Sequence, residues 1–139
     1  MSIFESEYEM NIPFHDLDPM NIVWHGNYIK YMEQARCDMF NKLNYTYYDM
    51  KNDNYAYPIA KMETKFIKPL YFNQKIVIKT ILEEVSPAII IRYKIYDKTS
   101  GEVIFKAKTI QIGIDIKTNE SIYSPPERLI KIMGNNNEI

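Results

Sequence analysis

Two aspartates stand before a proline in a short polar stretch, and a histidine and a glycine follow a few residues later. Asp16 and Asp18 precede Pro19, and His25 and Gly26 open a segment with helical spacing. The start of a helix offers unpaired backbone N–H groups and the positive end of the helix dipole, which suit a negatively charged oxygen. A carboxylate beside such a helix start can act as a nucleophile or as a general base on water. The spacing therefore predicts a site where a bound carbonyl is polarised and attacked.

The helix that follows must supply the backbone donors. From residue 26 to residue 43, apolar residues recur in steps of three or four, which indicates one helical face. This stripe consists of Tyr28, Met32, Ala35, Met39 and Leu43, and is widened by Ile29, Tyr31 and Phe40. We expect a helix this apolar to be wrapped by other elements rather than to lie on a surface.

The remaining chain favours strands. The first ten or so residues predict one strand, and alternating or β-branched patterns predict strands over residues 58–66, 75–83, 89–96 and 102–116. The order is a strand, a long helix and then strands in a meander. We therefore expect an α+β fold with one antiparallel sheet around one helix, in a single domain over residues 1–139 with a loose tail at 134–139. Its open sheet edges predict a homo-oligomer.

Composition narrows the class of protein. The chain has 139 residues, 46% of them hydrophobic, and a net charge of -1, so it carries no electrostatic footprint for nucleic acid or an anionic membrane. Cys37 is the only cysteine, which excludes an intrachain disulfide. The N-terminus is acidic rather than signal-like, and no apolar run is long enough to span a bilayer. We expect a cytoplasmic protein.

The stretch from Asp16 to Arg36 resembles the active-site motif of the 4-hydroxybenzoyl-CoA thioesterase superfamily, in particular its short bacterial acyl-CoA thioesterases. The matching letters are DLDPMNIVWHGNY followed by EQAR, and a weaker match is FIKPLYFNQ at residues 66–74. Asn21 departs from the pattern, where the family usually has glycine. Asn tolerates a positive φ better than most residues, so a tight turn is still feasible there.

The resemblance implies a hotdog fold, in which the sheet wraps the long helix, and hydrolysis of an acyl-CoA thioester to free acid and CoA. It implies a dimer as the functional unit, with a tetramer as the alternative, and no metal or organic cofactor. Asp18 becomes the catalytic carboxylate, as nucleophile or as base, and the backbone N–H of His25 becomes the oxyanion donor. The expected substrate-binding residues are Trp24, Gly26, Asn27 and Tyr28, with Gly26 allowing the substrate close to the backbone.

Several residues have a second interpretation. His25 could instead act through its imidazole, by protonating the leaving thiolate. Asp16 is more typical of a structural hydrogen-bond acceptor than of a second catalyst. A metal site built from the two histidines and the aspartates is disfavoured, because no two ligands have helical spacing.

Other polar residues have ordinary explanations. Glu33 and Arg36 are expected to form an intrahelical pair, and Cys37 is expected to pack rather than react. The tyrosines and lysines are more typical of half-buried or solvated positions than of an acyl pocket or a phosphate site. The candidate residues for those two sites are Tyr45, Tyr47, Tyr48, Tyr55 and Tyr57 for the acyl group, and Lys61, Lys65, Lys68 and Arg92 for CoA phosphates.

A thioesterase is thus the leading hypothesis from the sequence. The alternatives are a module that binds acyl thioesters without hydrolysing them and one that releases acyl groups from a carrier protein. A hotdog dehydratase is disfavoured, because its active-site context is missing from this chain.

Overall fold

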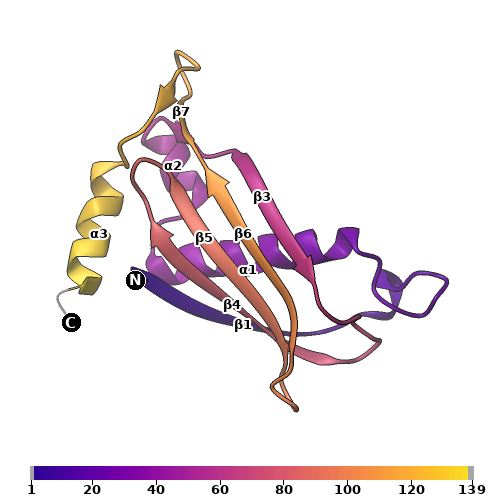
Figure 1. Ribbon diagram of the computed structural model, residues 1–139. Helices are drawn as coiled ribbons and strands as arrows, with labels where there is room; N and C mark the ends of the chain where they lie inside the picture. Colours follow the sequence, from indigo (N-terminus) through magenta and orange to yellow (C-terminus); the bar gives the residue numbers. More distant parts are fainter. Residues whose placement is uncertain (1, 138–139) are drawn as a thin grey trace.

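The computed structural model describes residues 2–137, in which a five-stranded antiparallel sheet crosses one long helix (Figure 1). The strand order is β1-β4-β5-β6-β3. The strands are β1 (Phe4–Asn11), β3 (Ile59–Phe66), β4 (Lys75–Glu84), β5 (Ile89–Asp97) and β6 (Val103–Gln111). The expected antiparallel sheet around one helix is confirmed.

The four strands after the helix were expected to form a meander, and this expectation is wrong for the first of them, β3. β4, β5 and β6 follow one another in space, but β3 pairs with β6 at the far edge. The connection over residues 67–74 makes this possible, because it crosses the end of the sheet instead of forming a hairpin. Leu70 anchors it: the side chain is fully buried, and its carbonyl accepts the Val23 N–H at 2.9 Å. The isoleucine-rich strands thereby occupy the centre, and the more polar β1 and β3 form the edges.

The long helix α1 spans Gly26–Leu43, as predicted from the sequence. It ends where Asn44 takes a left-handed conformation with φ of 65°. The helix lies behind the sheet and crosses its strands (Figure 1). Most of the predicted stripe is buried against the sheet, but Ile29 is 40% exposed and Cys37 is exposed. The expectation that Cys37 packs is therefore wrong, because the residue is exposed on the helix face turned away from the sheet.

The predicted last strand is broken at Ile112, and its end belongs to a second sheet with the order β2-β7-β8. That end is β7 (Gly113–Asp115). The elements that the sequence patterns missed are η1 (Phe14–Asp16), α2 (Tyr47–Asn52), β2 (Tyr55–Ala56), β8 (Ser121–Ile122) and α3 (Glu127–Asn137). Within the described residues, no helix is long and apolar enough to cross a bilayer.

The C-terminal helix α3 corrects the expected loose tail. The helix continues through Asn137, and residues 138–139 lie outside the described part of the chain. Leu129 and Met133 explain its position, because both are buried and their spacing of four puts them on one face. The sequence run of Gly134 and asparagines hid this helix, since these residues are poor helix formers.

Candidate functional site

A narrow loop before α1 holds Asp18. Leu17 and Val23 form an antiparallel bridge, and within it the Asp18 N–H donates to the Ile22 carbonyl at 2.8 Å. The Asn21 N–H donates back to the Asp18 carbonyl at 3.0 Å, so Asp18 to Asn21 form a tight turn. Asn21 has a φ of 65°, which confirms that it takes the backbone conformation usual for glycine here.

The Asp18 carboxylate is partly held by its own loop. Its Oδ1 accepts the Met20 N–H at 2.8 Å, which fixes the side-chain torsion. Its Oδ2 accepts no hydrogen bond from any group in residues 2–137. The carboxylate is half-buried and lines a cavity, so one oxygen is available to a ligand.

The start of α1 faces the same cavity. His25 occupies the N-cap position, and its side chain makes no capping bond. In the described chain, the backbone N–H groups of His25 and Gly26 have no acceptor, whereas the next amide, that of Asn27, donates to the Trp24 carbonyl at 2.9 Å. Two free amides at the positive end of an 18-residue helix can stabilise an oxyanion.

The cavity has a volume of about 350 Å³, near the lower end for small-molecule sites. Two chain segments line it, one from Asp18 to the start of α1 and one that begins at the last residue of β3. The lining residues are Asp18, Ile22, Val23, His25, Tyr28, Phe66, Ile67, Lys68 and Pro69. Tyr28 packs edge-on against Phe66 with ring centroids 5.0 Å apart, and the buried Phe105 lies 5.0 Å from both rings. Two of these rings, those of Tyr28 and Phe66, line the cavity.

Asp16 lies beneath the loop as a structural acceptor. It is buried, its Oδ2 accepts the Tyr31 O–H at 2.7 Å, and Lys30 Nζ lies 3.8 Å from its Oδ1. Its carbonyl accepts the Asn27 side-chain N–H at 2.9 Å. Asp16 thus fastens the Asp18 loop to the first turns of α1.

The residues expected at the site differ in where they lie. The structure brings Asp18, His25 and Tyr28 to one cavity, whereas Trp24, Gly26 and Asn27 are not among its lining residues. The space over Gly26 is occupied by the Trp24 indole, because a Cβ at position 26 would lie 2.2 Å from Trp24 Cζ3. Position 26 therefore needs a glycine because a larger residue would clash with the Trp24 indole, and not because a substrate approaches the backbone there.

Sequence reasoning missed the wall formed by residues 66–69, although the weaker family match at residues 66–74 was a signal for it. None of the five candidate tyrosines lines this cavity. Tyr45 and Tyr57 are core residues, and Tyr48 is 82% exposed. Lys68 does line it, and its ammonium is paired with the Glu102 carboxylate. Among residues 2–137, no three His, Cys, Asp or Glu side chains are grouped closely enough to hold a metal ion.

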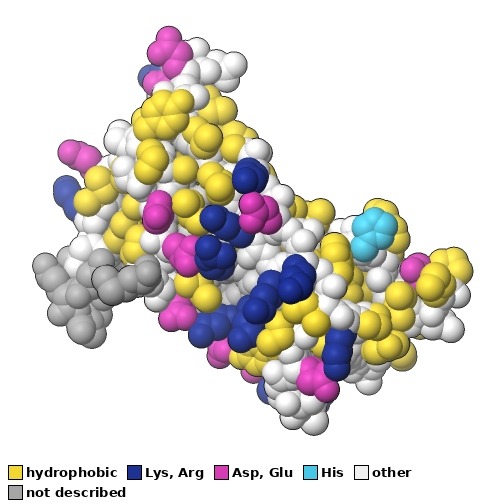
Figure 2. Space-filling model, viewed as in Figure 1, with side chains coloured by type: hydrophobic (Ala, Val, Ile, Leu, Met, Phe, Trp, Pro, Cys, Tyr) yellow, Lys and Arg dark blue, Asp and Glu magenta, His cyan; other side chains and the backbone are white. Residues whose placement is uncertain are grey.

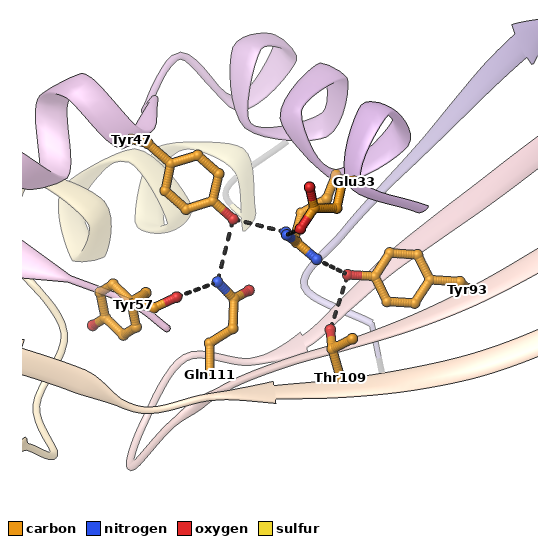
Figure 3. A network of polar contacts seen from close by, with 7 residues as sticks. Glu33, Tyr47, Tyr57, Tyr93, Thr109 and Gln111 are labelled. Carbon is orange, nitrogen blue, oxygen red and sulfur yellow. Dashed lines mark hydrogen bonds and ion pairs between the residues drawn. The ribbon is translucent and has the colours of Figure 1, made fainter. Parts of the chain in front are cut away.

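The expected Glu33–Arg36 pair is present at 3.3 Å, and it is one part of a larger network (Figure 3). Arg36 is 5% exposed, and its guanidinium donates to Tyr47 Oη at 2.7 Å and to Tyr93 Oη at 3.1 Å. Gln111 donates to the same Tyr47 oxygen at 3.2 Å. This network ties the middle of α1 to β5 and β6 and lies outside the cavity of Asp18.

Comparison with known proteins places the chain in a family. A family model described as the thioesterase-like superfamily matches residues 12–132. This chain belongs to that superfamily. Acyl-CoA thioesterase YbgC of Helicobacter pylori is 30% identical over 119 residues, which cover 81% of this chain and 85% of that protein. The resemblance seen in the sequence and the thioester hydrolase class are thereby confirmed.

Solved structures of other thioesterases have the same fold. The DHNA-CoA thioesterase of Staphylococcus aureus matches with a TM-score of 0.81 and 25% identity, over 96% of this chain and 89% of that one. A 1,4-dihydroxy-2-naphthoyl-CoA thioesterase from Synechocystis matches with a TM-score of 0.85 and 13% identity, over 97% and 98%. The hotdog fold is confirmed.

Proposed function

We propose that this thioesterase hydrolyses acyl-CoA thioesters to free acid and CoA in the cavity between Asp18 and the start of α1. The observation that carries the proposal is that one cavity is lined both by a carboxylate with one free oxygen and by His25 at the helix start, whose backbone N–H is free. The thioester carbonyl oxygen would accept from the backbone N–H of His25, which stabilises the negative charge that develops during attack. The Asp18 carboxylate would attack the carbonyl carbon or activate a water to do so.

The contacts of His25 favour its backbone role over the side-chain role. Its imidazole is exposed, with its ring centroid 5.2 Å from that of Trp24 and 6.4 Å from that of Phe66. No hydrogen bond with the described residues orients this ring toward a leaving group, which a general acid has to reach. The backbone N–H needs no particular side chain, so we propose it as the donor. Trp24, Gly26 and Asn27 then act by shaping the helix start, and Tyr28 by contacting the acyl group.

We also propose a homodimer as the functional unit. Phe66 and Ile67 line the cavity and remain 49% and 40% exposed at the end of β3, a strand with no neighbour on its outer side. A second copy on this side would exclude water from the cavity, which strengthens the electrostatic effects inside it. A tetramer, a carrier-protein thioester as substrate and the cytoplasmic location stay predictions from the sequence.

Asp18→Asn tests the mechanism. Asparagine keeps the oxygen that accepts the Met20 N–H, so the loop is preserved while the charge is lost. We expect kcat for a panel of acyl-CoA esters to fall by roughly two to four orders of magnitude, measured as thiol release. Asp115→Asn is the matched control, because Asp115 also holds a turn, by accepting the Lys117 N–H at 2.9 Å, but lies outside the cavity.

The same assay separates the two roles of His25. His25→Gln removes the imidazole but keeps the backbone N–H, so it should leave kcat within a few-fold of the wild-type value. A wild-type kcat in Asp18→Asn would eliminate the proposed carboxylate. Binding of acyl-CoA by the wild type without any thiol release would favour the binding module instead.

A further inference from the structure

The outer face of the main sheet carries lysines in direct register. Lys65 of β3 lies opposite Lys106 of β6, Lys106 lies opposite Lys94 of β5, and Lys94 lies opposite Lys79 of β4. Figure 2 shows Lys and Arg side chains gathered in a band over this face, the side of the sheet away from α1. Like charges directly opposite each other destabilise a sheet. The chain therefore keeps an arrangement that costs stability.

Carboxylates on this face neutralise only one end of the row. At the β4 end of the row Lys79 is paired with Glu5 at 3.1 Å, and other carboxylates are paired with basic residues beside the row: Glu63 with Lys61 at 3.1 Å and Glu83 with Arg92 at 2.8 Å. Lys65, Lys94 and Lys106 form no ion pair with any residue from 2 to 137. Positive charge is thus concentrated toward the β3 edge, although the whole chain has a net charge of -1.

A shallow groove of about 240 Å³ runs between basic side chains of this face. Its lining residues are Glu63, Thr64, Lys65, Arg92, Lys106, Ala107 and Lys108. Glu63 is the one carboxylate among them, and it is already engaged by Lys61. The hydrogen bond and charge of Lys61 lower the pKa of Glu63, and Lys108 and Arg92 add to this effect. The groove is therefore a place where a second anion would be stabilised.

We propose that this groove binds the phosphate groups of a small phosphorylated ligand, such as a diphosphate or a phosphorylated nucleotide. Adjacent strands are about 4.8 Å apart, so in-register lysines on neighbouring strands can contact one phosphate or two linked ones. Lys and Arg are the usual partners of phosphate, and a ligand with several charges would remove the repulsion along the row. Such phosphates could belong to the CoA part of the substrate or to a separate small molecule.

The position of the groove is compatible with either source. Lys65 lines the groove and the next residue, Phe66, lines the cavity of Asp18. Consecutive strand residues point to opposite faces, so the two sites are separated by the edge strand β3 alone. The CoA source rests on the proposed function, whereas phosphate binding itself does not.

Calorimetric titration with inorganic pyrophosphate and with CoA tests the site directly. The double substitution Lys65→Gln and Lys106→Gln should weaken binding roughly tenfold, since it removes two charge contacts of modest individual strength. The matched control is Lys117→Gln with Lys131→Gln, which removes two exposed charges outside the groove and should leave binding unchanged. Wild-type binding that is absent, or equal losses in both double variants, would overturn the proposal.

Steady-state kinetics then identify the source of the phosphates. If they belong to CoA, the groove variant should raise KM for an acyl-CoA roughly tenfold at similar kcat. It should leave KM unchanged for the same acyl thioester on pantetheine, which lacks the phosphates. If pyrophosphate binding depends on the lysines but neither KM changes, the ligand is a separate phosphorylated molecule. Because pyrophosphate binding is measured without hydrolysis, failure of the proposed function would not be mistaken for failure of this site.

Discussion

Tyr31 fixes Asp16, and through it the loop that carries Asp18. Its side chain is 1% exposed and donates to Asp16 Oδ2 at 2.7 Å. Burial raises the pKa of Tyr31, and the hydrogen bond to Asp16 raises it further. The phenol therefore stays protonated in the folded protein at a pH where it would ionise in the unfolded chain. Burial also raises the pKa of Tyr45 and of Tyr57.

These tyrosines predict a loss of stability at alkaline pH. In the unfolded chain a phenol loses its proton near pH 10, so above that pH the folded state binds more protons than the unfolded state. The free energy of unfolding should then fall by about 1.4 kcal/mol per pH unit for each such phenol, until the folded-state pKa is passed. Urea unfolding at several pH values from 8 to about 11 measures this dependence.

Tyr31→Phe isolates the contribution of one phenol to this pH dependence. The slope above pH 10 should become less steep by about 1.4 kcal/mol per pH unit, because one protonated phenol is gone. Tyr48→Phe is the matched control, since it removes a phenol that is 82% exposed, and it should keep the wild-type slope. Identical slopes in Tyr31→Phe and the wild type would contradict the assignment.

Among the elements, α1 is held at its middle by a buried charge. Arg36 reaches Tyr47 after the turn at the helix end and Tyr93 on β5, while Thr109 on β6 lies 2.9 Å from the Tyr93 hydroxyl (Figure 3). Its one carboxylate partner, Glu33, has a side chain that is 60% exposed. The helix position thus depends on hydrogen bonds to neutral hydroxyls more than on an ion pair.

Arg36→Met should lower the free energy of unfolding by roughly 1–3 kcal/mol, because the buried Tyr93 hydroxyl and the half-buried Tyr47 hydroxyl lose their charged donor while the volume is nearly kept. Glu33→Gln is the control, and its loss should not exceed about 1 kcal/mol, since an exposed ion pair contributes little. Urea denaturation of both variants at neutral pH gives the comparison. A larger loss in Glu33→Gln would mean that the ion pair, rather than the hydroxyl network, holds the helix.

Elements with a strong local pattern could be predicted from the sequence, but the neighbours of these elements in space could not. The bounds of α1 follow from its apolar spacing, and the turn at Asn21 follows from residue type. The position of β3 depends instead on the non-local burial of Leu70, which no periodicity reveals. The cavity wall at Phe66 also depends on this non-local packing. The motif therefore predicted Asp18 and the helix start but not the opposite wall of the cavity.

On the scale of the whole molecule, exposed apolar side chains gather at one end. They come from two segments, which are joined by the Val23–Leu70 hydrogen bond and by the packing of Phe14 against Phe72, whose ring centroids are 5.6 Å apart. The exposed members are Phe14, Met20, Trp24, Ile29, Phe66, Ile67, Tyr71 and Phe72. An apolar patch of this kind marks an interaction surface. It adjoins the open edge of β3, whereas the β1 edge is protected by Glu5, Glu7 and Glu9.

A second copy that pairs along β3 would cover both the patch and the open edge, as a symmetric dimer does with one self-complementary surface. Light scattering should therefore give about twice the chain mass of 16.6 kDa for the wild type. Ile67→Asp places a charge at the end of β3 and should shift the mass toward the monomer and reduce kcat, because the cavity loses its cover. Ile116→Asp, at a residue that is 44% exposed and outside the patch, should do neither. A dimer that survives Ile67→Asp with full activity would place the interface elsewhere on the molecule.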